Sequence, residues 1–174
     1  TGAAQTINND IDLAGKGGLV WLKSRSLAEN NMVFDTARGV TQRLFTDNTN
    51  GQSSSATSLT AFNSNGFSIS SGSYLNTNAA TYASWTFRKQ PKFFDVVTWT
   101  GDGTSTKTVA HNLQARAACI FIKKTSGAAD WMTFHLKSDG AGATLNLNTT
   151  AGGPAYGYSV GTADTVNNAT VVNG

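Results

Sequence analysis

The sequence predicts an all-β protein built from two tandem, related β-sandwich units. Three observations support this prediction: a low content of charged residues, short apolar runs between polar turns, and an internal repeat. Only 13% of the 174 residues are charged, whereas the helices of a bundle need charged residues along their exposed faces. Hydrophobic residues make up 39% of the chain and aromatic residues 10%, so a packed core is expected rather than disorder.

The expected strands are short runs of apolar, β-branched and aromatic residues that end at Gly, Asn, Asp or Ser. Such runs at short spacing indicate antiparallel strands in a sandwich or barrel. In chain order they are 18–23, 32–34, 43–46, 66–69, 81–87, 93–100, 107–110, 118–123, 131–135, 143–148 and 156–160. The segments 51–60 and 136–142 are small and polar, so loops are expected there, and 36–43 has room for one short helical turn.

An internal repeat relates the two parts of the chain. The run GLVWLK at 18–23 aligns with ACIFIK at 118–123, and 32–34 aligns with 132–134 at the same offset of 100 residues. Further matches keep the chain order with small gaps: Leu13 with Leu113, 5–7 with 107–109, 44–49 with 145–150, and 67–69 with 158–160. Alternating β sequences can align by chance, but the preserved order of the matches disfavours this alternative.

A repeat of this size is a domain-sized unit rather than one rung of a solenoid. We therefore expect a first unit at 1–90 and a related second unit at 91–174 that is incomplete at its C-terminal end. The run 93–99 has no counterpart before the first unit, and 81–87 has none in the second. A missing strand leaves an edge of unpaired backbone groups, so the repeat predicts a longer polypeptide or completion by another copy.

Several phrases taken in order are distinctive. They are FDVVTWTG at 94–101, TVAHNL at 108–113, IFIK at 120–123, Trp131, LNTT at 147–150, YSVG at 158–161 and TYASWTF at 81–87. This order resembles the repeated β-rich modules of virion structural and tail-fibre-like proteins of marine bacteriophages, especially cyanophages. The first unit departs from the pattern at 8–12, and the second departs after Val160.

The resemblance implies a phage virion module of a tail fibre, appendage or head decoration, assembled in the host cytoplasm. Its partners would be copies of itself and other virion proteins. The modules are similar to the jelly-roll sandwiches of concanavalin-like lectins, so the alternative is a carbohydrate-binding module that recognises a host surface glycan. No enzymatic activity is implied. The 13 basic residues are scattered and apolar runs are far shorter than the roughly 20 residues of a membrane span, so neither nucleic acid nor membrane is an expected partner.

Carboxylates that could carry catalysis or bind a metal are scarce. The only glutamate, Glu29, falls in an expected loop. Asp10 and Asp12 lie two residues apart beside two asparagines, which favours a surface turn over a calcium-type oxygen cluster or a catalytic pair. Asp102 lies between glycines, where Asp usually bonds its own backbone. We expect no catalytic residue, no cofactor and no bound metal.

The histidines and the cysteine are expected to be structural. His111 aligns with Asn9 or Asp10 in the first unit, and His135 aligns with Asp35. A catalytic role would not alternate between His and Asp or Asn, so both histidines are expected to be solvated or structural. Cys119, inside a strand, is expected to behave as a small buried apolar residue.

The tryptophans give the remaining candidates. Trp21, Trp85 and Trp99 lie in the strongest runs, so we expect them in the core. Trp131 follows Asp130 at the start of a strand. Core packing is favoured for Trp131, and the alternative is stacking on a sugar ring or contact with a partner. Trp131 and Asp130 are therefore the candidate residues of a glycan or partner site.

Overall fold

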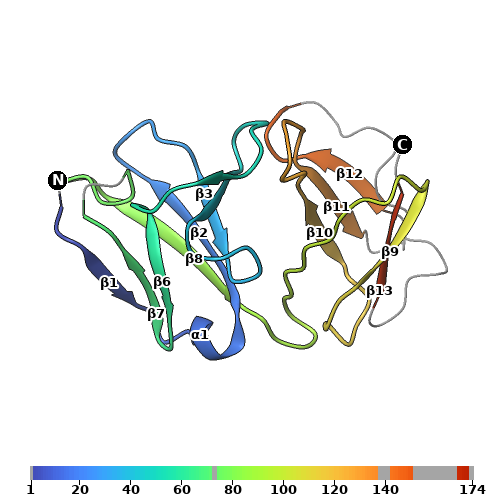
Figure 1. The fold of residues 1–174 in the computed structure, drawn as a ribbon, viewed down its shortest axis with the longest axis horizontal. Coiled ribbons are helices and arrows are strands. Elements are labelled where there is room, and N and C mark those ends of the chain that lie inside the picture. Colours follow the sequence, from blue (N-terminus) through green and yellow to red (C-terminus); the bar gives the residue numbers. More distant parts are fainter. Residues whose placement is uncertain (1, 72–73, 137–141, 151–167, 173–174) are drawn as a thin grey trace.

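The computed structural model describes residues 2–71, 74–136, 142–150 and 168–172. The described chain is mostly β, and its strand pairings are antiparallel. Figure 1 shows two halves side by side, the first with β1–β8 and the second with β9–β13. Among the described strands, no pairing joins one half to the other.

The first half contains two open sheets. A five-stranded sheet has the order β5-β4-β3-β2-β8, and a three-stranded sheet has the order β1-β7-β6. The elements are β1 (Gln5–Asn8), α1 (Leu13–Lys16), β2 (Gly18–Ser24), β3 (Met32–Asp35), β4 (Gln42–Phe45), β5 (Ser53–Ser54), β6 (Leu59–Asn63), β7 (Gly66–Ile69) and β8 (Tyr82–Arg88).

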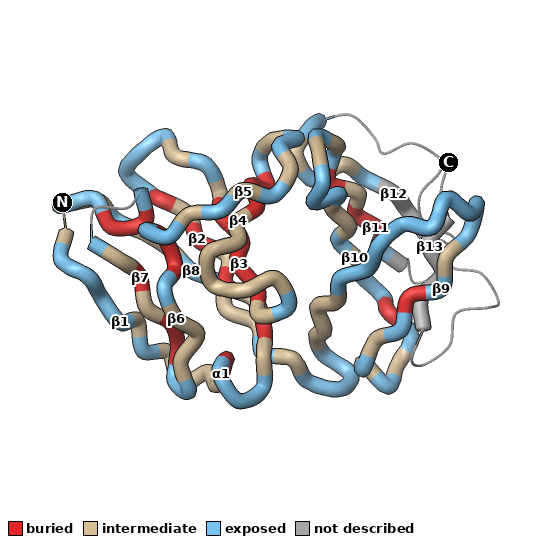
Figure 2. Tube along the Cα trace, in the orientation of Figure 1, coloured by how far each residue is buried: buried red, intermediate tan, exposed pale blue. Residues whose placement is uncertain are grey.

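One apolar core lies between these two sheets. Its members come from β2, β3 and β4 of one sheet and from β6 and β7 of the other: Val20, Leu22, Met32, Phe34, Phe45, Leu59, Phe67 and Ile69, joined by Leu13 and Leu75. Burying a large apolar side chain stabilises the fold by about 1.5–3 kcal/mol. Figure 2 shows most of the buried positions on these strands, so each sheet turns one face to the shared core.

The short helix α1 carries Leu13 into this core. Asp12 is its N-cap, since Gly15 N donates to Asp12 Oδ1 at 2.7 Å. The helix ends at Gly17, whose φ of 75° is in the left-handed region that favours glycine. The segment 36–43, where one helical turn is expected, begins with a single turn closed by a hydrogen bond from Gly39 N to Asp35 O at 3.0 Å, and it contains no longer helix. No helix in the described part of the chain is long and apolar enough to cross a bilayer.

The second half is smaller. It contains the sheet β10-β11-β12 and a two-stranded ribbon of β9 and β13. The strands are β9 (Thr106–Ala110), β10 (Cys119–Ile122), β11 (Met132–Leu136), β12 (Gly142–Asn146) and β13 (Asn168–Val172). Val109, Ala117, Trp131 and Phe134 are its buried apolar residues among those described.

The strand registers of the two halves match at positions about 100 residues apart. Val20 pairs with Phe34, and Ile120 pairs with Phe134, so β2–β3 and β10–β11 keep the same register at an offset of 100. In the next strand the alignment offset rises from 100 to 101 residues, and the pairing follows it: Leu44 lies opposite Val33, and Leu145 lies opposite Thr133. The aligned segments therefore occupy the same places in the two sheets.

The pair β1–β7 in the first half has the pair β9–β13 as its equivalent in the second. The strand that takes the place of β7 is not the one that the sequence alignment predicts. Ile7 lies opposite Phe67, and Val109 lies opposite Ala169. Residues 169–171 thus hold the place of 67–69, which the alignment had given to 158–160. The run 158–160 lies outside the described residues.

The strand predicted at 93–100 is wrong. This segment follows Pro91 and Lys92, where Lys92 has a φ of 62° and reverses the chain. Phe94 forms only an isolated bridge with Gln90. Its ring packs on Phe87 of β8 at a centroid distance of 5.5 Å. Aromatic side chains here cover the end of a neighbouring strand, which a strand-like composition does not distinguish from a new strand.

Candidate functional site

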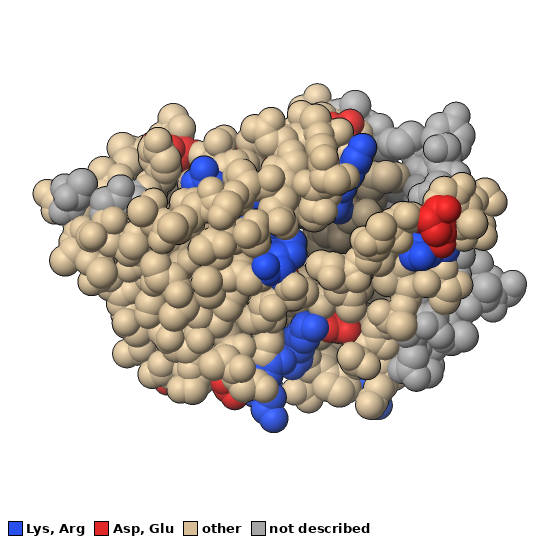
Figure 3. Space-filling view, viewed as in Figure 1, with Lys and Arg blue, Asp and Glu red and all other residues tan. Residues whose placement is uncertain are grey.

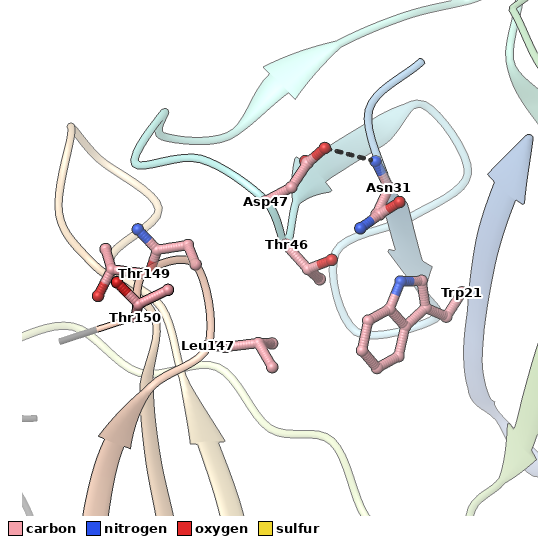
Figure 4. A pocket seen from close by; sticks show the side chains of 8 residues that line it. Trp21, Asn31, Thr46, Asp47, Leu147, Thr149 and Thr150 are labelled. Carbon is pink, nitrogen blue, oxygen red and sulfur yellow. Dashed lines mark hydrogen bonds between the residues drawn. The ribbon is translucent and has the colours of Figure 1, made fainter. Parts of the chain in front are cut away.

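A pocket of about 350 Å³ lies where the two halves meet. It is lined by residues of both: Trp21, Asn31, Thr46 and Asp47 from the first half, and Leu147, Asn148, Thr149 and Thr150 from the second. In Figure 4 the Trp21 ring and the Leu147 side chain approach from opposite sides, with Thr46 and Asn31 beside the ring. The volume is in the range of small-molecule sites.

Strand alternation places Trp21 at this pocket. Val20 and Leu22 point into the core, so Trp21 between them points to the opposite face of the sheet. Trp85 lies directly opposite on β8. The two rings are 6.0 Å apart at an interplanar angle of 59°, a tilted geometry that stabilises aromatic pairs. Trp85 therefore packs beside the Trp21 ring and does not itself line the pocket.

The same turn from each repeat forms the two walls. Asn31 N donates to Asp47 Oδ2 at 3.2 Å, and Trp131 N donates to Asn148 Oδ1 at 2.8 Å. Each turn is closed in the same way by a main-chain hydrogen bond of 3.0 Å, from Thr46 N to Asn31 O and from Leu147 N to Trp131 O. Since these residues are related by 100 or 101 positions, the pocket lies between equivalent turns of the repeat.

A lysine near the end of β2, and its equivalent after β10, each donate a hydrogen bond to the loop that leads to the next strand. Lys23 Nζ donates to Glu29 O at 2.5 Å, and Lys123 Nζ donates to Ala129 O at 2.7 Å. In the loop between β2 and β3, Glu29 thus accepts this hydrogen bond with its main-chain oxygen. Burial lowers the pKa of Lys123, while the nearby charge of Asp130 acts in the opposite direction.

Hydrogen bonds also join the two halves beside the pocket. They link 45–52 with 123–131: Trp131 Nε1 to Phe45 O at 2.6 Å, Lys123 Nζ to Thr49 O at 2.9 Å, Ala129 N to Thr49 O at 2.9 Å and Gln52 N to Thr125 O at 2.9 Å. A Cβ atom on Gly51 would lie 2.9 Å from both Gly127 N and Thr125 O. The close approach of these loops therefore needs glycine at position 51.

Two buried polar atoms of the pocket lack a partner. Thr46 Oγ1 and Asn31 Oδ1 have no hydrogen bond within the described part of the chain. Thr46 is only 3% exposed. Leaving a buried polar group unpaired costs about 1–3 kcal/mol. Four other buried side-chain atoms of the described residues also lack a partner, on Arg38, His111, Thr133 and Asn146. Thr46 and Asn31 differ from these because they line the pocket, where a polar ligand that reached their oxygens would offset this cost.

The two candidate residues from the sequence lie beside this pocket but do not line it. Trp131 is 6% exposed and donates its indole N–H to Phe45 O. Its ring therefore has little free surface for a sugar, and core packing, the favoured interpretation, describes its position. Asp130 is exposed, and Asn148 Nδ2 donates to Asp130 Oδ1 at 2.8 Å. Asp130 thus orients a residue of the pocket wall, and its contact with a glycan or partner stays a prediction.

The histidines occupy the aligned positions. Leu113 N donates to His111 Nδ1 at 3.2 Å, and Ile11 N donates to Asn9 Oδ1 at the same distance. His111 is therefore the counterpart of Asn9 in a local turn, as one of the two alignments predicted. His135 is exposed on β11 and lies opposite Cys119 just as Asp35 lies opposite Leu19.

Three residues expected in the core are exposed. Trp85 is 50% and Trp99 40% exposed, and Cys119 is also exposed. Trp85 lies on the sheet face away from the core, and Cys119 lies on an edge strand. Trp99 lies within 93–100, the segment that is not a strand. Around Trp85 both faces of the five-stranded sheet carry apolar side chains, and the three-stranded sheet covers only one of these faces.

The acidic residues that the structure describes do not assemble into a further metal site. Asp102 accepts hydrogen bonds from Lys107 Nζ at 2.8 Å and from Thr104, which together hold the pKa of its carboxyl well below the usual range. Asp12 caps α1. Asp10, two residues earlier in the chain, has a φ of 59° and does not lie on a strand. The described residues contain no group of three or more His, Cys, Asp or Glu side chains placed to hold a metal ion.

Sequence reasoning missed the residues that do line the pocket. Trp21 was expected in the core, and Asn31, Thr46 and Asp47 gave no recognisable motif. The usable signal was the repeat itself, which aligns 44–49 with 145–150 and so marks two equivalent turns. The two turns face each other because of the way the halves pack together. A sequence alignment carries no information about that packing.

The chain belongs to the family DUF7483, a domain of unknown function whose family model matches residues 1–173. Comparisons with curated proteins and with solved structures found no match. The family match spans both halves of the repeat and therefore includes both walls of the pocket.

Proposed function

We propose that this chain is a non-enzymatic recognition module that binds a saccharide in the pocket between its halves. The observation that carries the proposal is the Trp21 ring in a pocket with two buried polar atoms, Thr46 Oγ1 and Asn31 Oδ1, that have no hydrogen-bond partner among the described residues. A sugar ring has an apolar face of C–H groups that packs on an indole, while its hydroxyls need hydrogen-bond partners. Asp47 and Asn148 add polar groups around the same pocket.

The resemblance to phage virion modules supplies a setting for this activity. In a tail fibre, appendage or decoration protein, such a pocket would recognise a glycan of the host surface, and the module would contact copies of itself and other virion proteins. We also propose that the halves are sandwiches of the jelly-roll type. The two sheets of the first half, which share one core, support this finer description.

The proposal is tested by glycan binding to the purified chain, first on a glycan array and then by titration of the bound saccharide. Trp21→Ala is expected to weaken binding about tenfold or more, which corresponds to about 1.4 kcal/mol. Trp99→Ala is the matched control, because it removes another exposed tryptophan outside the pocket. Absence of binding to any saccharide, or an equal effect of both variants, would contradict the proposal.

A structural role in assembly is the second candidate function. Large apolar side chains exposed on the described surface favour it: Tyr74, Trp85, Phe93, Trp99 and Phe121 among others. Exposed apolar surface of this kind often marks a protein–protein interface. Sedimentation velocity over a range of concentrations is expected to detect oligomers that Phe93→Ser weakens. A monomer at every concentration would exclude self-assembly through this surface.

A further inference from the structure

Among the described strands, β10 has a neighbour on one side only, whereas its counterpart β2 has a neighbour on each side. In the described part of the chain, β10 pairs only with β11, at one end of the order β10-β11-β12. The equivalent strand β2 pairs with β3 on one side and with β8 on the other. Figure 1 draws β10 as the strand of its sheet nearest to the first half, and Figure 3 shows the surface hollowed between the halves, with Lys and Arg side chains at its border.

The side chains of β10 match those that receive β8 in the first half. On β2, Leu19 lies opposite Phe87 and Trp21 lies opposite Trp85. The aligned residues of β10 are Cys119 and Phe121. Both are exposed, and Phe121 is 51% exposed in the middle of a strand. The side chains that pair with aromatic residues of β8 in one repeat are therefore uncovered in the other.

We propose that β10 accepts an antiparallel strand from a neighbouring protein chain, and that this strand carries aromatic side chains at alternate positions as β8 does. Main-chain hydrogen bonds to the open edge would supply affinity, and the aromatic pairs would fix the register. The register of the β2–β8 interface places a tryptophan opposite Phe121 and a phenylalanine opposite Cys119. The proposal does not depend on the saccharide pocket.

A labelled peptide with the sequence of 81–88, TYASWTFR, is the probe for this edge. Its binding to the full chain is measured by fluorescence anisotropy. The control peptide TYAWSFTR has the same composition, but it moves the tryptophan and the phenylalanine to the other face of a strand and leaves the tyrosine in place. We expect the control to bind about tenfold more weakly or not at all. Equal binding of both peptides would overturn the proposed register.

Two variants locate the binding edge. Phe121→Thr is expected to weaken peptide binding about tenfold, while Leu145→Thr on β12 is expected to leave it unchanged. These residues are a matched pair, since they lie at opposite edges of one sheet and are 51% and 52% exposed. Loss of binding in the Leu145 variant alone would place the peptide at the wrong edge and overturn the proposal.

The reactivity of the exposed Cys119 thiol measures whether a peptide is bound at β10, without any mutation. Alkylation by iodoacetamide at pH 8 is expected to slow about fivefold or more at saturating peptide, since an added strand covers β10. Unchanged alkylation with the peptide bound would overturn the assignment to β10. A dimer of the chain alone that Phe121→Thr abolishes would also overturn it, because the occupant would then be a second copy of this chain.

Discussion

The Thr46 hydroxyl is buried and has no hydrogen-bond partner in the described part of the chain. Its removal therefore distinguishes an effect on stability from an effect on ligand binding. Thr46→Val keeps the shape of the side chain and removes the unpaired oxygen. We expect the free energy of unfolding to stay constant or rise by up to about 1 kcal/mol, while saccharide affinity falls. Urea denaturation and ligand titration measure the two effects. A large loss of stability would mean that the hydroxyl has a structural partner.

Asp102 gives a prediction on pH. Hydrogen bonds from Lys107 and Thr104 depress its pKa in the folded state, and the unfolded chain has the ordinary value. The stabilising effect is therefore present above the unfolded pKa of about 4 and is lost as the pH falls toward the folded pKa. Asp102→Asn is expected to lower the urea midpoint slightly at pH 6 and to have less effect at pH 3. An equal difference at both pH values would contradict this.

Residue roles were predictable where the repeat supplied a comparison. The alignment of His111 with Asn9 and of His135 with Asp35 predicted structural roles, and the matching turn bond of His111 agrees with this. The burial of individual tryptophans was not predictable. Alternation assigns Trp21 and Trp85 to one face of a strand, but it does not say which face the second sheet covers.

At the scale of elements, sequence patterns located strands that have strong apolar alternation and missed weaker ones. The run at 66–69 coincides with β7, and 18–23 lies within β2. In contrast, β6 and β13 contain few large apolar residues and were not predicted. The opposite error at 93–100 arose because its aromatic residues pack on β8 as side chains, without a strand partner for the backbone.

The junction between loops 45–52 and 123–131 gives a prediction for an element pair. Gly51→Ala places a Cβ atom 2.9 Å from two main-chain atoms of the other loop. Backbone has to shift to relieve this overlap, so we expect a loss of about 1–3 kcal/mol in the free energy of unfolding. Gly101→Ala is the control, because nothing lies within 4 Å of its Cβ position. Chemical denaturation of both variants measures the difference, and equal stability of the two would contradict the close packing of these loops.

At the scale of the molecule, the halves are packed together rather than merely linked in sequence. Val33 and Leu44 lie on the sheet face away from the first core, by alternation with Met32, Phe34 and Phe45, yet they are only 3% and 4% exposed. Two related units could be inferred from the repeat. The packing of the two units against each other could not be inferred. It depends on contacts such as the hydrogen bond from Trp131 to Phe45 O, and the residue equivalent to Trp131 in the first half is Asn31, so the repeat does not contain this contact twice.

Trp131→Phe tests this coupling of the halves. Phenylalanine keeps an aromatic ring in the same place but removes the indole N–H that donates to Phe45 O. A buried carbonyl oxygen loses its partner, so we expect a loss of about 1–3 kcal/mol in the free energy of unfolding. Trp99→Phe changes an exposed tryptophan and should alter stability by less than about 0.5 kcal/mol.

Hydrogen exchange in the same variant shows where the coupling lies. The amides of Gln52 and Ala129 donate across the junction, whereas those of β2 belong to the first sheet. If Trp131 holds the halves together, Trp131→Phe will speed exchange at Gln52 and Ala129 more than in β2, because local opening of the junction needs less free energy than unfolding of a sheet. A uniform increase across both regions would instead mean that the halves open only when the whole molecule unfolds.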